Sequence, residues 1–247
     1  MTADALARQL AEKASLSLEP IYARLHLIAE EVLRVRPKRA ALTEAHLSGL
    51  QRLLVELLGE ESAAWGMGFV AAPSVVEGME RYLAWWQRRG ERVARLRLNF
   101  DPASIDVYDY LQMDWYQLAQ RGQGRVAYGP YVDYSGSDMY TITATIPIVA
   151  DGIFLGVAGA DLVVGEVEHR LVSALRQTAE DVVIVSTERR VISANTSRWL
   201  VGSRLAALPS AGPATDPSAF REVVDMPLGT GWVLAVAWPE TAEAAKN

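Results

Sequence analysis

The sequence contains no cysteine, which excludes disulfide bonds, thiolate metal sites and a cysteine nucleophile. Its three histidines are dispersed, and no two of them stand at the spacing of paired metal ligands (His26, His46 and His169). The Gly-x-Ser-x-Gly motif of serine hydrolases is missing too. We therefore predict no metal site, no cofactor and no catalytic residues. An enzyme that acts on a small amine stays open as an alternative, because paired carboxylates such as Asp109 and Asp114 can carry out acid–base chemistry.

Long apolar runs and an excess of positive charge are also missing. No window approaches the roughly 20 uncharged apolar residues of a membrane-spanning helix, and Asp4 stands where a signal peptide has basic residues. Lys and Arg total 24 against 30 Asp and Glu, and the formal charge of −6 argues against a nucleic-acid partner. On this basis we expect a cytoplasmic protein without a membrane span.

Apolar residues make up 50% of the 247 residues, enough for one large or two modest globular domains. Residues 4–35 carry apolar side chains at helical spacing, with Pro20 inside the pattern and Pro37 after it. A second helical pattern runs from Thr43 to Gly59. The apolar stripe on residues 4–35 could cover the protein's own core or pair two chains. A homodimer through this helix is one prediction, and a structural dimerisation module without a ligand is an alternative function.

Strand patterns dominate from Trp65 onward, in two successive groups. The first group lies at residues 65–72, 92–100, 140–148 and 153–160, and Asp151-Gly152 indicates a hairpin between its last two strands. A helix predicted from Gly165 to Thr178 precedes the second group, at residues 181–186, 191–194, 220–226 and 231–238. Because hairpins join these strands, we predict an α+β protein with a long N-terminal helix and two antiparallel sheet modules flanked by helices. The predicted divisions are 1–62, 63–165 and 166–247.

The segment from Tyr108 to Asp161 concentrates aromatic and acidic residues. Aromatic faces and carboxylates both favour a small cation, so the segment predicts a binding site for a small organic cation. Plainer interpretations stay open. Trp115 and Tyr116 could be core residues, Asp161 could cap the next helix, and Asp114 could be a solvated helix acid.

The chain after Trp65, together with the long opening helix, resembles the Cache superfamily of sensor domains in its double Cache arrangement. In that family a long helix precedes two PAS-like modules, and the first module binds a small ligand. The pattern of the second module is present at residues 182–185, 190–194 and 201–205. The resemblance implies that residues 63–165 form a ligand-binding Cache module with a sensing and signalling role.

The amino-acid-sensing signature of the first module is matched in part. Tyr108 corresponds to its tyrosine, and Trp115 and Tyr116 correspond to its Trp-Tyr pair. Asp161 corresponds to its aspartate, but Met113 stands where the signature has an arginine. In the family the aspartate and the aromatic residues hold the ligand's ammonium, while the arginine holds its carboxylate. The resemblance therefore implies a small amine more readily than an α-amino acid, although an amino-acid-like ligand stays open.

The resemblance adds residues on strands that commonly face the same pocket. These are Tyr131, Asp133 and Tyr140. The full predicted set of ligand-binding residues is Tyr108, Met113, Asp114, Trp115, Tyr116, Tyr131, Asp133, Tyr140 and Asp161.

Overall fold

The structure is a computed structural model that describes residues 3–239 except residues 102, 106, 135–138 and 217. It divides into a larger unit, residues 20–166, and a smaller unit formed by residues 1–19 and 167–247. The opening helix α1 (Ala3–Val35) continues through Pro20 and contributes to both units. Each unit has its own antiparallel sheet, which confirms the predicted α+β fold with a long N-terminal helix and two sheet modules.

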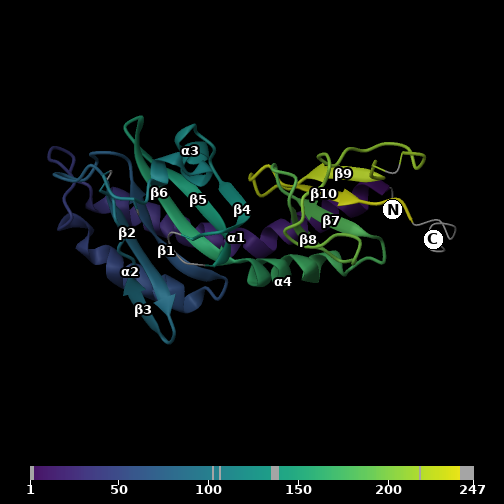
Figure 1. The fold of residues 1–247 in the computed structure, drawn as a ribbon, viewed down its shortest axis with the longest axis horizontal. Coiled ribbons are helices and arrows are strands. Elements are labelled where there is room, and N and C mark those ends of the chain that lie inside the picture. The colour runs from purple at the N-terminus through teal and green to yellow at the C-terminus, as the bar shows by residue number, and fades with distance from the viewer. Residues whose placement is uncertain (1–2, 102, 106, 135–138, 217, 240–247) are drawn as a thin grey trace. The chain divides into compact units, whose positions relative to one another are not determined.

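The larger unit contains most of the secondary structure (Figure 1). Its elements after α1 are η1 (His46–Gly49), α2 (Leu50–Glu60), β1 (Ala64–Ala71), β2 (Leu83–Arg89), β3 (Arg92–Arg95), η2 (Tyr110–Gln112), α3 (Asp114–Gln120), β4 (Val126–Val132), β5 (Tyr140–Ala150), β6 (Ile153–Val163) and the beginning of α4 (Val164–Leu175). The six strands pair in the order β3-β2-β1-β6-β5-β4, with every pair antiparallel. The first strand therefore lies at the centre, between its hairpin partner and the last strand.

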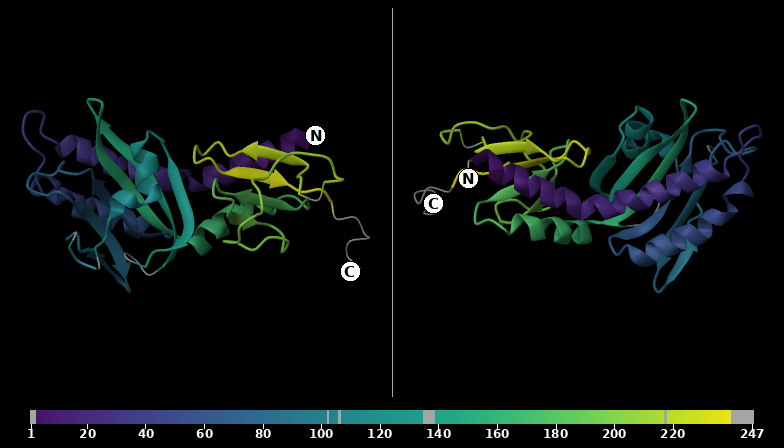
Figure 2. Two further views of the ribbon diagram at one scale, coloured as in Figure 1. Left: turned by 45° about the horizontal axis from the view of Figure 1, so that its top comes forward. Right: turned by 180° about the vertical axis from the view of Figure 1, so that it is seen from behind.

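Side chains of this sheet alternate between two faces, as the two-residue period of a strand requires. On β5, Thr143 and Thr145 share one face, and the buried Ile142, Ala144 and Ile146 share the other. Helix α3 covers the threonine face, where the Thr145 hydroxyl donates a hydrogen bond to the carbonyl of Trp115 at 3.0 Å. The second half of α1 and helix α2 cover the opposite face (Figure 2). We call the threonine side the cavity face.

The smaller unit contains a four-stranded sheet in the order β8-β7-β10-β9, built from β7 (Val182–Val185), β8 (Val191–Ala194), β9 (Glu222–Asp225) and β10 (Val233–Val236). Its first strand is again central. Asn195 ties the sheet to the end of α4, because its side-chain amide donates to the carbonyls of Leu175 and Glu180 and accepts from the backbone N–H of Val182.

Two of the predicted elements that differ from the observed ones border the candidate site. The strand predicted over residues 92–100 ends at Arg95, and residues 96–100 leave the sheet as irregular chain. Residues 108–120, whose sequence predicts one helix around Trp115, form two shorter elements, because the Asp109 carboxylate accepts from the backbone N–H of Leu111 and caps a short 3-10 turn. Met113 then has an extended backbone, and α3 begins at Asp114. Both differences affect the shape of the candidate site.

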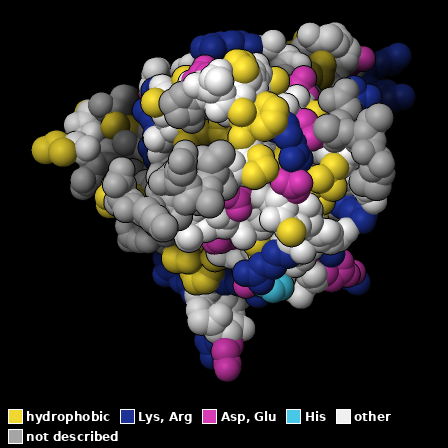
Figure 3. Space-filling model, turned by 90° about the vertical axis from the view of Figure 1, so that its right-hand side faces the viewer, with side chains coloured by type: hydrophobic (Ala, Val, Ile, Leu, Met, Phe, Trp, Pro, Cys, Tyr) yellow, Lys and Arg dark blue, Asp and Glu magenta, His cyan; other side chains and the backbone are white. Residues whose placement is uncertain are grey.

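Charge is mixed on the face shown in Figure 3, where Lys and Arg side chains are interspersed with Asp and Glu. On the described part of this face no broad surface of one sign is present. Among the described residues, no helix is both long enough and apolar enough to cross a membrane.

Candidate functional site

A small cavity lies on the cavity face of the larger sheet. It has about 20 Å³ of free space, which is room for roughly one water molecule. Strands, helix α3 and the irregular segment after β3 all contribute to its wall. The lining residues are Val70, Leu83, Trp85, Leu96, Leu98, Tyr108, Trp115, Asp133, Thr143 and Asp161.

Glycines on two strands make space for the indole ring of Trp85 in the cavity wall. Trp85 pairs with Gly68 of β1, which in turn pairs with Gly159 of β6. A Cβ at Gly68 would lie 2.9 Å from Cε3 of Trp85, and one at Gly159 would lie 3.2 Å from Cζ3. The absence of side chains at these two positions therefore lets the ring lie against the neighbouring strands.

A hydrogen-bonded chain leads to the carboxylate of Asp161, which lies within β6. The Thr143 hydroxyl donates to Oδ1 of Asp161 at 2.8 Å. The Tyr131 hydroxyl lies 2.7 Å from the same Thr143 oxygen. Because a threonine hydroxyl carries one proton, which here goes to Asp161, the Tyr131 hydroxyl donates to Thr143. This chain fixes the position of the carboxylate while leaving acceptor capacity for a ligand.

Asp133 follows β4 and supplies a second, buried carboxylate to the cavity. Burial and, after it, the negative charge of Asp133 raise the pKa of Asp161 to about 7, although the Thr143 hydrogen bond acts in the opposite direction. Asp161 is half-buried and lines the cavity. Burial, followed by the charges of Asp133 and Asp161, also raises the pKa of the Tyr108 phenol, which stays neutral.

Trp115 and Tyr116 are neighbours on α3 but have different roles. Trp115 lines the cavity. Tyr116 is fully buried in the apolar cluster beside it, with its ring centroid 5.4 Å from that of Tyr110 and 5.6 Å from that of Phe154. Of the predicted pair, only Trp115 therefore faces the cavity.

The structure brings four of the predicted residues together at the cavity: Tyr108, Trp115, Asp133 and Asp161. Tyr131 joins them through Thr143.

The remaining predicted residues lie elsewhere. Met113 is half-buried at the start of α3, where it packs against the apolar cluster. Asp114 is exposed in the first turn of α3, and Tyr140 is 42% exposed at the start of β5. Asp161 precedes α4 by three residues and lies inside β6, so it is not the helix cap that the plainer interpretation allowed.

Sequence reasoning missed Thr143, Trp85 and the apolar wall. Thr143 had a usable signal, because it stands on a strictly alternating strand and pairs directly with Asp161 across the β5–β6 hairpin. Trp85 had none, since its place depends on the pairing of β2 with β1 and on glycines far away in the sequence.

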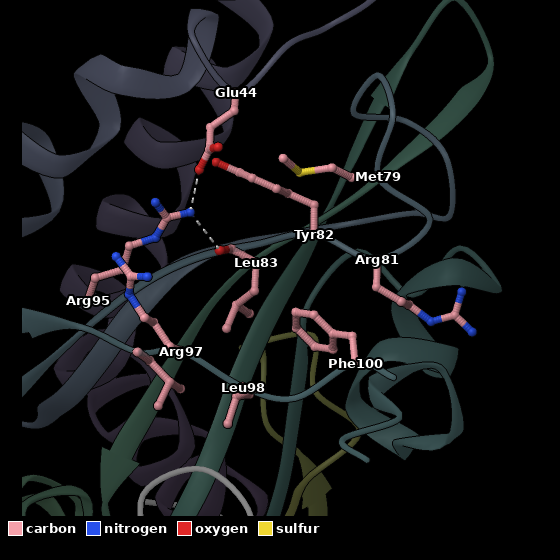
Figure 4. A pocket seen from close by; sticks show the side chains of 10 residues that line it. Glu44, Met79, Arg81, Tyr82, Leu83, Arg95, Arg97, Leu98 and Phe100 are labelled. Carbon is pink, nitrogen blue, oxygen red and sulfur yellow. Dashed lines mark hydrogen bonds and ion pairs between the residues drawn. The ribbon is translucent and has the colours of Figure 1, made fainter. Parts of the chain in front are cut away.

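An open hollow of about 490 Å³ lies next to the cavity (Figure 4). Leu83, Leu96 and Leu98 line both spaces, so these side chains form the partition between them. In the hollow, Arg95 donates to the Glu44 carboxylate at 2.8 Å and to the Leu83 carbonyl at 3.5 Å, as the dashed lines in Figure 4 show.

The described residues include no group of three or more His, Cys, Asp or Glu side chains that could hold a metal ion.

Comparisons with known proteins point to sensor domains. Residues 50–168 match the model of the family described as methyl-accepting chemotaxis protein-like, first PDC sensor domain. No curated protein sequence gives a significant match.

Solved structures share the fold over nearly the whole chain. The extracellular domain assigned to the histidine kinase mmHK1S-Z3 aligns with a TM-score of 0.61 and 15% identity, over 98% of this chain and 95% of that chain. The ligand-binding domain of the Campylobacter jejuni chemoreceptor Tlp3 in complex with L-valine aligns with a TM-score of 0.59 and 15% identity, over 98% and 95%. The sensory domain of Tlp3 with isoleucine bound aligns with a TM-score of 0.57 and 14% identity, again over 98% and 95%.

The expected cytoplasmic location is wrong. The family match is to a chemoreceptor sensor domain, and the fold is shared with extracellular and chemoreceptor sensor domains. The acidic N-terminus and the lack of a long apolar run were therefore poor guides to location. Residues 50–168 are similar to a first PDC sensor domain, and the chain as a whole has the PDC (Cache) fold of chemoreceptor and histidine kinase sensor domains.

Proposed function

We propose that this chain is an extracellular or periplasmic sensor domain that binds a small organic cation in the cavity of its larger unit. One observation carries the proposal. Asp133 and Asp161 line the same cavity, and none of the described residues that line it is Lys or Arg. Two carboxyl groups in one cavity wall, whose described residues include no Lys or Arg, favour positive charge there.

The energetic argument rests on relief of carboxylate repulsion. Asp133 raises the pKa of Asp161, so full ionisation of the pair is costly in the free protein. An ammonium group placed between them offsets this cost, and its ion-paired hydrogen bond should contribute about 1.5–3 kcal/mol. Contact with the faces of Trp115 and Tyr108 should add about 0.5–2 kcal/mol through cation–π attraction.

An α-amino acid is the second candidate ligand, and the Tlp3 complexes with L-valine and isoleucine favour it. Such a ligand also needs a partner for its carboxylate. Met113 packs against the apolar cluster, and Asp133 and Asp161 would repel the ligand carboxylate. We therefore rank an amine above the zwitterion.

The experiment is a thermal-shift series with three ligands that share one branched apolar skeleton. Isobutylamine carries the cation alone, L-valine carries both charges, and isobutyrate carries the anion alone. A ligand that binds only the folded protein raises its melting temperature by mass action. We expect isobutylamine to stabilise the protein most and isobutyrate not at all. Stabilisation by isobutyrate, or by L-valine above isobutylamine, would refute the cation proposal.

A further inference from the structure

Trp85 carries a buried hydrogen-bond donor that the fold does not use. Its indole N–H has no partner among the described residues, and the side chain is 4% exposed. The indole N–H of Trp115 is likewise buried without a described partner. Both rings line the cavity. Leaving a buried N–H unpaired is costly, so two such donors on residues that line one cavity call for an explanation.

The position of the Trp85 N–H places it near Asp161. Nε1 of Trp85 lies 2.5 Å from the point where a Cβ on Gly66 would stand. Gly66 pairs directly with Asp161 across β1 and β6. Cβ positions of directly paired residues lie roughly 4.5–5.5 Å apart on the same face of the sheet. The N–H is therefore within one small ligand's length of the carboxylate.

The charge of the cavity determines which acceptor can meet this donor. An anionic acceptor would lie close to Asp133 and Asp161 with no Lys or Arg in the described lining to balance it. A neutral carbonyl accepts the same hydrogen bond without this repulsion. We propose that the ligand carries a neutral hydrogen-bond acceptor beside its ammonium group, and that Trp85 is the residue that recognises this acceptor. An α-amino amide fits this description and an α-amino acid does not. The inference rests on the proposed function, which it makes more specific.

A ligand of this size requires the cavity to enlarge, because about 20 Å³ holds only one water molecule. The part of the wall that can move outward is the irregular segment after β3, because it lies outside the sheet. This segment carries Leu96 and Leu98. On their other side these residues border the open hollow of Figure 4, which has about 490 Å³ of space. Outward movement of the two leucines would leave the sheet, Trp85 and Asp161 in place.

The test is calorimetric titration of the protein with isobutylamine, L-valinamide and L-valine at neutral pH. A neutral hydrogen bond contributes about 0.5–1.5 kcal/mol, which corresponds to roughly 2–10-fold in affinity. We expect L-valinamide to bind more tightly than isobutylamine by this factor and L-valine to bind most weakly.

Variants of two adjacent tryptophans test whether the higher affinity for L-valinamide depends on the Trp85 N–H. Trp85→Phe removes the N–H, and the matched control Trp86→Phe changes the next residue of β2, which is also buried but faces the opposite side of the sheet. The readout is the affinity ratio of L-valinamide to isobutylamine, since loss of ring area weakens both ligands alike. The ratio should fall to about one in Trp85→Phe and stay at the parent value in Trp86→Phe.

The possible failures can be told apart. If isobutylamine binds but L-valinamide binds no better, or if Trp85→Phe keeps the parent ratio, the inference is overturned and the cation site stands. If L-valine binds most tightly, or if none of the three binds, both the inference and the proposed function are overturned. The ligand series on the parent protein decides the question even if Trp85→Phe fails to fold.

Discussion

At the scale of single residues, the site depends on how Asp161 is held. Its pKa is raised to about 7 by burial and by the charge of Asp133, although Thr143 donates a hydrogen bond to it. The folded protein therefore holds a proton on this carboxyl over a pH range in which the unfolded chain, with an ordinary pKa of 3.8, has released it. Folding and protonation are linked at this position.

The linkage predicts how stability changes with pH in the absence of ligand. Between pH 3.8 and about 7 the folded state binds more protons at Asp161 than the unfolded state does, so the stability contribution of this residue falls as pH rises. Asp161→Asn retains an acceptor for Thr143 but does not titrate. In thermal unfolding from pH 4 to pH 8, the melting temperature of the parent should decline relative to that of Asp161→Asn. Parallel curves would show that the carboxyl has an ordinary pKa.

The proximity of four candidate residues was predictable, while their binding of a ligand stays a prediction. Tyr108, Trp115, Asp133 and Asp161 were expected to share a pocket, and the structure places them at one cavity. Tyr116, next to Trp115, turns into the core because successive residues on a helix point about 100° apart. The sequence pattern does not indicate which member of the pair faces the cavity.

At the scale of elements, local signals predicted hairpins well and irregular segments poorly. Asp151-Gly152 forms the turn between β5 and β6, and both residues have the positive φ angles that such a turn needs. The end of β3 at Arg95 was not predictable from the alternation of residues 92–100, since the chain leaves the sheet to form the cavity wall. Residues after Arg95 line the cavity instead of continuing the strand.

One position near the centre of the sheet has no room for a side chain and is occupied by glycine. Gly156 of β6 has a φ of +131°, and a Cβ there would lie 2.1 Å from the carbonyl oxygen of Val70. Gly152 also has a positive φ, at +75°, but a Cβ there would meet nothing within 4 Å. Backbone strain should cost each alanine variant about 1–3 kcal/mol.

The two alanine variants should therefore differ in stability. The clash should cost Gly156→Ala about 1–3 kcal/mol more than strain alone. Chemical denaturation would measure the free energy of unfolding of both variants. Equal losses would mean that β1 and β6 do not approach each other as closely as described.

At the scale of the whole molecule, the sequence predicted two sheet modules after a long helix, and the structure contains both sheets. The division at residues 62 and 165 stays a prediction. The location was mispredicted because nothing in composition or periodicity distinguishes an extracellular sensor domain from a cytoplasmic protein.

Homodimerisation through α1 also stays a prediction, and the structure narrows the residues involved. Most apolar side chains of the helix are buried within the chain, but Leu16, Leu27 and Leu33 are exposed. We expect a homodimer in sedimentation experiments, weakened by Leu27→Glu and unaffected by Val55→Glu at an exposed position on α2. A parent protein that stays monomeric at high concentration would contradict this.

The central claim is that Asp161 holds a cationic ligand by its charge. Calorimetric titration of isobutylamine into the parent, Asp161→Asn and Asp114→Asn tests it most directly, because both variants replace one carboxyl group with a neutral amide and Asp114 is exposed on α3 outside the cavity lining. Loss of a charged hydrogen bond worth about 1.5–3 kcal/mol should weaken binding at least about tenfold in Asp161→Asn. Asp114→Asn should bind like the parent. Equal affinity in all three proteins, or an equal loss in both variants, would contradict the account.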